Sequence, residues 1–197
     1  MSETVYQIRI HLCAIEPAIW RRIQIPSSYN FWDLHVAIQD AMGWEDRHLH
    51  QFRIPVDNSK AIMVGVPFQQ GIGGGAEVIA GWKVPVSEYL VDPGATIVYR
   101  YDFSAGWKHT VTLEAVLPEE RFHTYPRCTD GERACPPEKV MGVAGYYRFL
   151  ESLKRPQKRM SLVLQERIVP DYDPEAFDPA AVRFDDPAKR WERTFRE

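Results

Sequence analysis

The segment ATIVYRYDFSAGWKHTVTLEAV, residues 95–116, decides the fold class of this chain. Its first half alternates apolar and polar residues, which is typical of a half-buried strand. Ser104–Gly106 forms a turn, and the second half returns with the same period of two, so the segment predicts an antiparallel hairpin. One face of the first strand carries Ile97, Tyr99, Tyr101 and Phe103, and one face of the return strand carries His109, Val111 and Leu113.

The chain before this hairpin shows the same short elements. Residues 5–12 and 19–25 alternate and predict a second hairpin, while Asn30 and Gly43 are suited to begin and end a helix over residues 31–42. Further elements are predicted as a strand over 48–54 and helices over 143–153 and 158–167.

These elements predict an α+β fold in which helices cover one side of a mostly antiparallel sheet. The chain has 197 residues, no internal repeat and no long linker. A single domain over residues 1–197 is therefore expected, with a core over about 5–178 and a helical tail over 179–197.

Composition excludes several classes of protein. Hydrophobic residues make up 45% of the chain, and the net charge of −3 does not favour bulk attraction to nucleic acid. The three cysteines are too few and too widely spaced for a disulfide framework or a Cys-x-x-Cys metal site. No signal peptide and no apolar run of membrane-spanning length is present, so we expect a cytoplasmic protein without a membrane partner.

An ordered set of motifs runs along nearly the whole chain. The motifs are Ile19-Trp20-Arg21-Arg22, Leu34-His35, Gly43-Trp44, His48-Leu49-His50-Gln51-Phe52, Tyr99-Arg100-Tyr101-Asp102-Phe103, Gly106-Trp107-Lys108-His109, Tyr125-Pro126-Arg127-Cys128, Pro136-Pro137-Glu138 and Tyr172-Asp173-Pro174-Glu175. In this order they resemble the plasmid pRiA4b ORF-3-like family. The resemblance implies a protein found on plasmids or as a passenger of transposable elements, where some members carry the label TnpR-like. Recombinase activity does not carry over, because no serine follows the first strand.

The sequence departs from the family pattern at three places. Ser104 and Ala105 stand where the family has Gly-Asp, and Lys139 stands where it has an aspartate. Val143 follows Gly142 where the family has a second glycine. Any site that used those two acids is altered in this chain.

The histidines suggest where a site lies. On a strand, His48 and His50 would point to the same face, a spacing that can bind one metal ion. Asp102 and His109 would complete a set suited to zinc, manganese or iron. The alternative is that the histidines are hydrogen-bonded within a packed sheet, that Asp102 braces its turn, and that Trp107 packs. The candidate pocket contains Trp20, Arg22, His35, Trp44, His48, His50, Asp102, Trp107, His109 and Glu138.

Two functions fit such a pocket. The first is an accessory binding protein of mobile elements that needs no cofactor and holds a ligand, a peptide or the end of a nucleic acid. The second is a metal-dependent hydrolase, including a nuclease, that uses His48, His50, Asp102 and His109 at the same pocket. The missing acid at Ala105 favours binding, with nucleic acid or another mobile-element protein as the expected partner.

Overall fold

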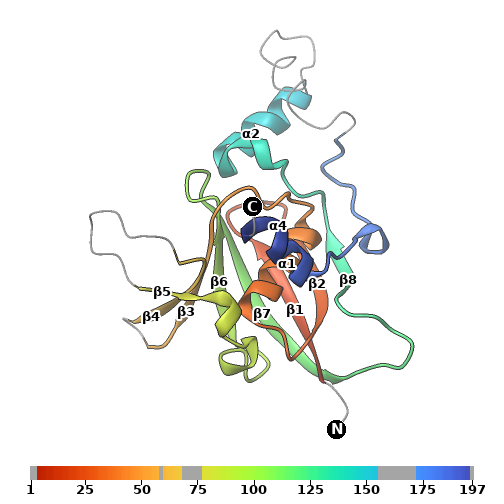
Figure 1. Ribbon diagram of the computed structural model, residues 1–197. Helices are drawn as coiled ribbons and strands as arrows, with labels where there is room; N and C mark the ends of the chain where they lie inside the picture. The colour runs from red at the N-terminus through yellow and green to blue at the C-terminus, as the bar shows by residue number, and fades with distance from the viewer. Residues whose placement is uncertain (1–3, 58–59, 68–76, 155–171, 196–197) are drawn as a thin grey trace.

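The computed structural model describes residues 4–57, 60–67, 77–154 and 172–195 (Figure 1). One eight-stranded sheet has the order β5-β4-β3-β6-β7-β1-β2-β8, and all neighbours in it are antiparallel except β4 and β5. The strands are β1 (Thr4–Leu12), β2 (Ile19–Pro26), β3 (His50–Pro55), β4 (Ala61–Gly65), β5 (Val78–Ala80), β6 (Thr96–Tyr101), β7 (Trp107–Pro118) and β8 (Arg127–Glu132). The helices within these ranges are α1 (Phe31–Met42), α2 (Gly142–Leu153), α4 (Pro187–Phe195) and the short 3₁₀ turns η1 (Gly81–Lys83), η2 (Val86–Glu88), η3 (Glu138–Val140) and η4 (Pro179–Ala181). The predicted α+β class, with one domain and a mostly antiparallel sheet, is confirmed.

The predicted hairpin of residues 95–116 is present as β6 and β7. Strand β6 ends at Tyr101, because Asp102 takes a left-handed conformation with φ 48° and starts the turn. The Asp102 carboxylate accepts the backbone N–H groups of Ser104 and Ala105, both at 3.1 Å. Phe103, expected on the buried face of the strand, lies in the turn instead and is 39% exposed.

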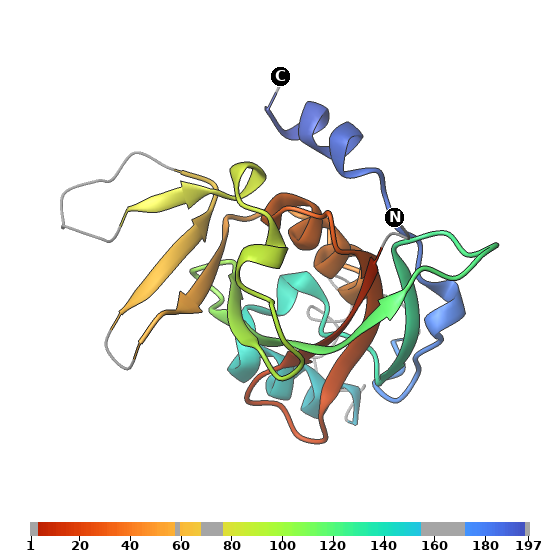
Figure 2. The same cartoon turned by 90° about the horizontal axis from the view of Figure 1, so that it is seen from below.

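Helix α1 begins and ends where the sequence predicts. The Asn30 side chain accepts the N–H groups of Trp32 and Asp33 at 2.8 and 3.0 Å, and the Asp33 carboxylate accepts the N–H of Asn30 in return. Gly43 ends the helix in the left-handed conformation that favours glycine. Most of α1 is buried, because the sheet lies on one side of it and α4 lies on the other (Figure 2).

Three strands, β4, β5 and β8, were not predicted. Strand β8 is one of the two edge strands of the sheet and consists of mainly polar residues that are half-exposed on both faces, so it shows no apolar alternation. Gly131 in β8 is required by the tail, since an added Cβ would lie 2.4 Å from the Phe177 ring. The Arg21 guanidinium lies 3.6 Å from the centre of the same ring, which fixes the tail against the sheet.

The C-terminal part of the chain crosses the sheet edge and ends on α1. Helix α4 lies on the outer side of α1, as Figures 1 and 2 both show. Helix α2 lies at one end of the sheet (Figure 1), and its Tyr146 and Phe149 join the core. The helix expected over residues 158–167 falls outside the described residues. None of the described helices is long and apolar enough to cross a bilayer.

Candidate functional site

A buried polar network lies between α1 and the sheet. His35 and Gln39 are four residues apart on α1, so both face the same strand, β6. Gln39 Nε2 donates to the Tyr99 hydroxyl at 2.8 Å, and His35 Nδ1 lies 2.8 Å from the same oxygen. All three side chains are fully buried. Their hydrogen bonds therefore form in a low-dielectric interior, where leaving one unmade is costly.

The turn after α1 adds a carboxylate to this network. Gly43 reverses the chain, and Asp46 then takes a left-handed conformation with φ 55°. The backbone N–H of Asp46 donates to Gln39 Oε1 at 3.2 Å, and its carboxylate lies 2.8 Å from His35 Nε2. The left-handed residue thus turns the carboxylate inward toward the histidine.

The charge state of Asp46 determines which atoms donate in the hydrogen bonds between Tyr99, His35 and Asp46. Burial lowers the pKa of His35 well below its usual value, so the ring is neutral and carries one proton. When Asp46 is ionised it only accepts, so His35 Nε2 donates to it and Nδ1 accepts from Tyr99. A protonated Asp46 could instead donate to His35 Nε2, with Nδ1 then donating to the Tyr99 hydroxyl. The network therefore couples Tyr99 to the charge state of Asp46.

His50, the first residue of β3, stacks on His35. The two ring centroids are 3.4 Å apart and the planes differ by 10°. Burial, and then the neighbouring His35, lower the pKa of His50 well below its usual value. His35, Asp46 and His50 each offer one ligand atom within 4.8 Å of the others, and we call them the His35–Asp46–His50 cluster.

A cleft of about 270 Å³ opens onto Asp46. We call it the Asp46 cleft; it is lined by Trp44, Glu45, Asp46, Arg190, Arg193 and Thr194. Burial raises the pKa of Asp46 to about 6, and His50 and Arg190 oppose that rise. Asp46 thus changes its charge near neutral pH, at a place open to a ligand.

The four residues predicted to share a metal do not meet at one point. Strand β3 begins at His50, so the alternation of a strand does not extend to His48, which precedes it with its side chain 44% exposed. His48 Nε2 lies 3.7 Å from the Asp102 carboxylate, which already accepts a hydrogen bond from the Ser104 hydroxyl of the turn. His109 lies in the core, where burial lowers its pKa to about 3. Within the described residues, the set of three groups close enough for a metal is the His35–Asp46–His50 cluster instead.

Three other predicted residues surround Trp44. Its ring packs on Trp107 and His109, with centroids 5.5 and 5.3 Å apart. Trp107 Nε1 and both ring nitrogens of His109 are buried without a partner in the described chain. Glu138 accepts from the Tyr101 hydroxyl and from the backbone N–H of Glu45. Trp44 thus lines the cleft and Glu138 bonds its neighbour Glu45, while Trp107 and His109 pack against the Trp44 ring.

Trp20 and Arg22 lie on the other face of the sheet. Arg21, between them, donates to the Ala41 carbonyl of α1, and neighbouring residues of a strand point to opposite faces. The Arg22 guanidinium pairs with Glu114 at 2.5 Å. Trp20 and Arg22 therefore lie outside the predicted pocket.

Sequence reasoning missed Gln39, Asp46, Tyr99 and Arg190 as site residues. Gln39 and Tyr99 share a face with predicted neighbours, and their spacing on α1 and β6 is visible in the sequence. Asp46 and Arg190 carry no such signal, because their meeting depends on a turn and on a helix at the opposite end of the chain.

A family model described as plasmid pRiA4b ORF-3-like protein matches residues 4–181. The chain belongs to this family. The uncharacterized protein y4hQ of Sinorhizobium fredii (strain NBRC 101917 / NGR234) is 31% identical over 200 residues, which cover 100% of this chain and 98% of the relative. The crystal structure of a protein of unknown function, MM3350 from Methanosarcina mazei Go1, has a TM-score of 0.80 at 37% identity and covers 93% of this chain and 100% of its own.

The departures from the pRiA4b ORF-3-like pattern fall outside the Asp46 cleft. Ser104, Ala105 and Lys139 are absent from its lining. Ala105 lies against the start of α2 instead, where a Cβ added to Gly142 would be 2.2 Å from the Ala105 carbonyl oxygen. The cleft of this family member is therefore complete without the two missing acids.

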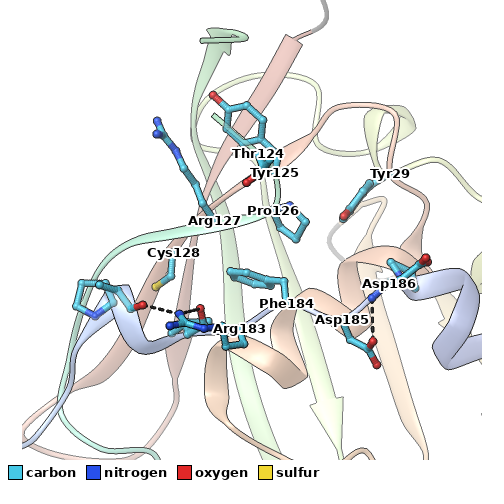
Figure 3. Close-up of a pocket in the computed structure, with 14 residues that line it drawn as sticks. Tyr29, Thr124, Tyr125, Pro126, Arg127, Cys128, Arg183, Phe184, Asp185 and Asp186 are labelled. Carbon is cyan, nitrogen blue, oxygen red and sulfur yellow. Dashed lines mark hydrogen bonds between the residues drawn. The ribbon is translucent and has the colours of Figure 1, made fainter. Parts of the chain in front are cut away.

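A second hollow, of about 640 Å³, lies between the entry to β8 and the tail (Figure 3). We call it the tail groove. Figure 3 shows Phe184 near Pro126 in its middle, with Tyr29 across from them. Arg127 and Arg183 lie on one side of it, and Asp185 and Asp186 lie on the other. This mixed charge gives no continuous basic track for a phosphate backbone.

Proposed function

We propose that this chain is an accessory binding module of plasmids and mobile elements, and that its ligand enters the Asp46 cleft. One observation carries the proposal. The Asp46 carboxylate faces the cleft on one side and is hydrogen-bonded on the other by the buried His35, whose ring is held in turn by Tyr99 and, through Tyr99, by Gln39. A carboxylate oriented by a rigid network, with a pKa near neutrality, is suited to recognise one ligand geometry. The association with plasmids rests on the family's description.

Binding fits the cleft better than catalysis without a metal. The lining has one hydroxyl, Thr194, and that hydroxyl donates to the carbonyl oxygen of Arg190 at 2.9 Å. His35, the nearest general base by position, has both ring nitrogens in hydrogen bonds. Among the residues that line the cleft, no nucleophile is therefore paired with a free base.

A metal-dependent hydrolase is the second candidate, favoured by the His35–Asp46–His50 cluster. The stacking opposes it. Imidazole lone pairs lie in the ring plane, and two planes 3.4 Å apart and within 10° of parallel do not meet at an ion about 2.0–2.1 Å from both nitrogens. The positive charge of Arg190 nearby also disfavours a cation with α4 in place. Metal binding would require one ring to turn.

Untagged protein tests both candidates. We would measure bound metal by elemental analysis and bound small molecules by native mass spectrometry, and then screen a chemically diverse library by thermal shift. The variant is Asp46→Asn, and the matched control is Glu119→Gln, which removes one exposed carboxylate away from the cleft.

Ligand binding that is lost in Asp46→Asn and kept in Glu119→Gln supports the binding module. Near-stoichiometric metal that is lost in His50→Ala and kept in His48→Ala supports the hydrolase instead. Wild-type protein that retains no molecule, responds to no compound and holds no metal contradicts both.

A further inference from the structure

The sheet has an open face, opposite the face on which α1 packs (Figure 2). Along the middle of β1, β3, β6 and β7, buried core residues alternate with side chains that are half-exposed or exposed. Successive residues of a strand point to opposite faces, so the more exposed set lies on the open face. Within the described chain, this face is therefore a broad surface in contact with solvent.

Basic side chains follow one another across the open face. Arg100 of β6 and Lys108 of β7 are directly opposite each other. Arg53 of β3 is one diagonal step from Arg100, and His11 of β1 is one diagonal step from Lys108. Diagonal neighbours on adjacent strands are about 7–8 Å apart, and Arg9 follows His11 two residues along β1. We call these five residues the basic track.

The centre of the basic track is a pair of like charges. Directly opposite side chains on adjacent strands have Cβ atoms about 4.5–5.5 Å apart, and like charges in such a pair are destabilising. Arg100 and Lys108 form this pair, and both are exposed. The Arg100 guanidinium lies 5.7 Å from the Phe103 ring, but among the described residues neither cation forms an ion pair with a carboxylate. The pair thus carries a repulsion that a bound anion would relieve.

On the rest of the same face, positive charge is compensated within the chain. Arg22 of β2 lies opposite Arg9 and pairs with Glu114 at 2.5 Å and with Asp130 at 2.7 Å. The Arg9 guanidinium lies 4.0 Å from the centre of the Trp20 ring, beside these pairs. The acids of the open face therefore gather at β7, β1, β2 and β8 around Arg22, and leave the part of the basic track on Arg53, Arg100 and Lys108 uncompensated.

The net charge of −3 does not cancel this local charge. Charges on a protein surface are screened over about 8 Å at physiological ionic strength. Neighbouring cations of the basic track lie within that distance and act together on one ligand. The attraction is therefore a property of this face and not of the chain as a whole.

We propose that the basic track binds the phosphate backbone of a single-stranded nucleic acid. A phosphate between Arg100 and Lys108 replaces their repulsion with charge-assisted hydrogen bonds, and a guanidinium binds two of its oxygens at once. A nucleic-acid strand carries one phosphate per nucleotide, and this regular spacing suits a track with one basic residue at each step. A flexible strand also follows the twist of a sheet, which a rigid duplex does not.

The proposed contacts recognise the backbone and not the sequence of bases. Val98 and Thr110 separate the cations of the basic track on β6 and β7, and neither side chain offers a ring on which a base can stack. The basic track lies on the opposite face of the sheet from His50 and the Asp46 cleft. The proposal therefore does not depend on the function proposed for that cleft.

The experiment measures binding of a labelled single-stranded oligonucleotide of about 16 nucleotides by fluorescence anisotropy at several salt concentrations. The variant is Arg100→Gln with Lys108→Gln. The matched control is Arg148→Gln with Lys189→Gln, which removes the same charge from exposed positions of α2 and α4. We expect the variant to bind about tenfold more weakly or worse, and the control to stay within about twofold of wild type. The slope of log K against log salt should fall by about 1.4 in the variant, since each phosphate contact contributes about 0.7 on a single strand.

Equal weakening in the variant and the control would indicate bulk attraction alone and would overturn the proposal, as would wild-type protein that binds no oligonucleotide at low salt. Polyglutamate and vesicles of phosphatidylcholine with phosphatidylserine test other anionic partners. If either binds wild type more tightly than the oligonucleotide and is lost in the variant, the assignment to nucleic acid is wrong. If the variant does not fold, as judged by circular dichroism, Arg53→Gln with Lys108→Gln carries the same comparison.

Discussion

Replacing Tyr99 with phenylalanine removes one oxygen atom from the centre of the buried network. That oxygen accepts from Gln39 Nε2 and donates to His35 Nδ1, each at 2.8 Å. The phenylalanine ring fits the space, since the ring contacts of Tyr99 with Phe52 and His109 do not involve the hydroxyl. The change therefore isolates the hydrogen bonds from the packing.

The cost follows from the groups left behind. A buried polar group without a partner costs about 1–3 kcal/mol, and Tyr99→Phe leaves two of them. Gln39 keeps the bond from its Oε1 to the Asp46 backbone, so it cannot turn away without breaking a second contact. We expect a loss of about 3 kcal/mol in the free energy of unfolding, which lowers the Tm of a domain of this size by roughly 6–12 °C.

Urea unfolding followed by fluorescence and circular dichroism measures this loss. The matched control is Tyr147→Phe, which removes a hydroxyl from a tyrosine 39% exposed, and it should cost less than about 1 kcal/mol. A Tyr99→Phe variant that is no less stable than Tyr147→Phe, with an unchanged m-value, would refute the account of the network. Coupling to Gln39→Leu in a double-mutant cycle should exceed about 0.5 kcal/mol.

Three further outcomes are expected. The pKa of Asp46 is about 6 in the folded state, above its ordinary value of 3.8, so the folded state holds this proton more tightly than the unfolded state. The wild type should therefore lose stability relative to Asp46→Asn as the pH rises from about 4 to 6. Parallel curves of stability against pH for the two proteins would contradict this. Gly142 and Gly43 have similar positive φ angles of 79° and 76°, but a Cβ added at Gly142 would lie 2.2 Å from a carbonyl oxygen of the β6–β7 turn, whereas one added at Gly43 meets open space. The loss in free energy of unfolding, measured by chemical denaturation, should be about 1 kcal/mol for Gly43→Ala and at least twice that for Gly142→Ala. Arg21 is 2% exposed and donates to three backbone carbonyls, whereas Arg22 makes partly exposed ion pairs; Arg21→Met should cost about 2–3 kcal/mol and Arg22→Met about 1 kcal/mol or less, and equal costs would sink the assignment of the two faces.

Local patterns explain which parts of the fold were predictable. Asn30 and Gly43 mark α1 because capping and the left-handed turn depend on neighbouring residues alone. The hairpins follow from a period of two. Strand β8 gave no such signal, because an edge strand with polar residues on both faces does not alternate.

The candidate site was half predictable for the same reason. Of four residues expected in one pocket, His35 and His50 stack on each other, Trp44 lines the Asp46 cleft, and Glu138 accepts from the backbone of Glu45, which also lines it. His48 was misplaced because the strand begins two residues later than its alternation suggested. Trp20 and Arg22 were misplaced because the sequence does not show which face of β2 the helix covers.

The sequence by itself determined the class of fold, the caps of α1, the family, and the faces to which most side chains of the central strands point. These follow from interactions between residues close in the chain. Only the tertiary structure decided that Asp46 meets His35 and His50, and that Arg190 reaches Asp40 across 150 residues of sequence. The periodicity of an element fixes the direction of its side chains, whereas the neighbours they meet depend on how separate elements pack, and that is set by the burial of the whole core.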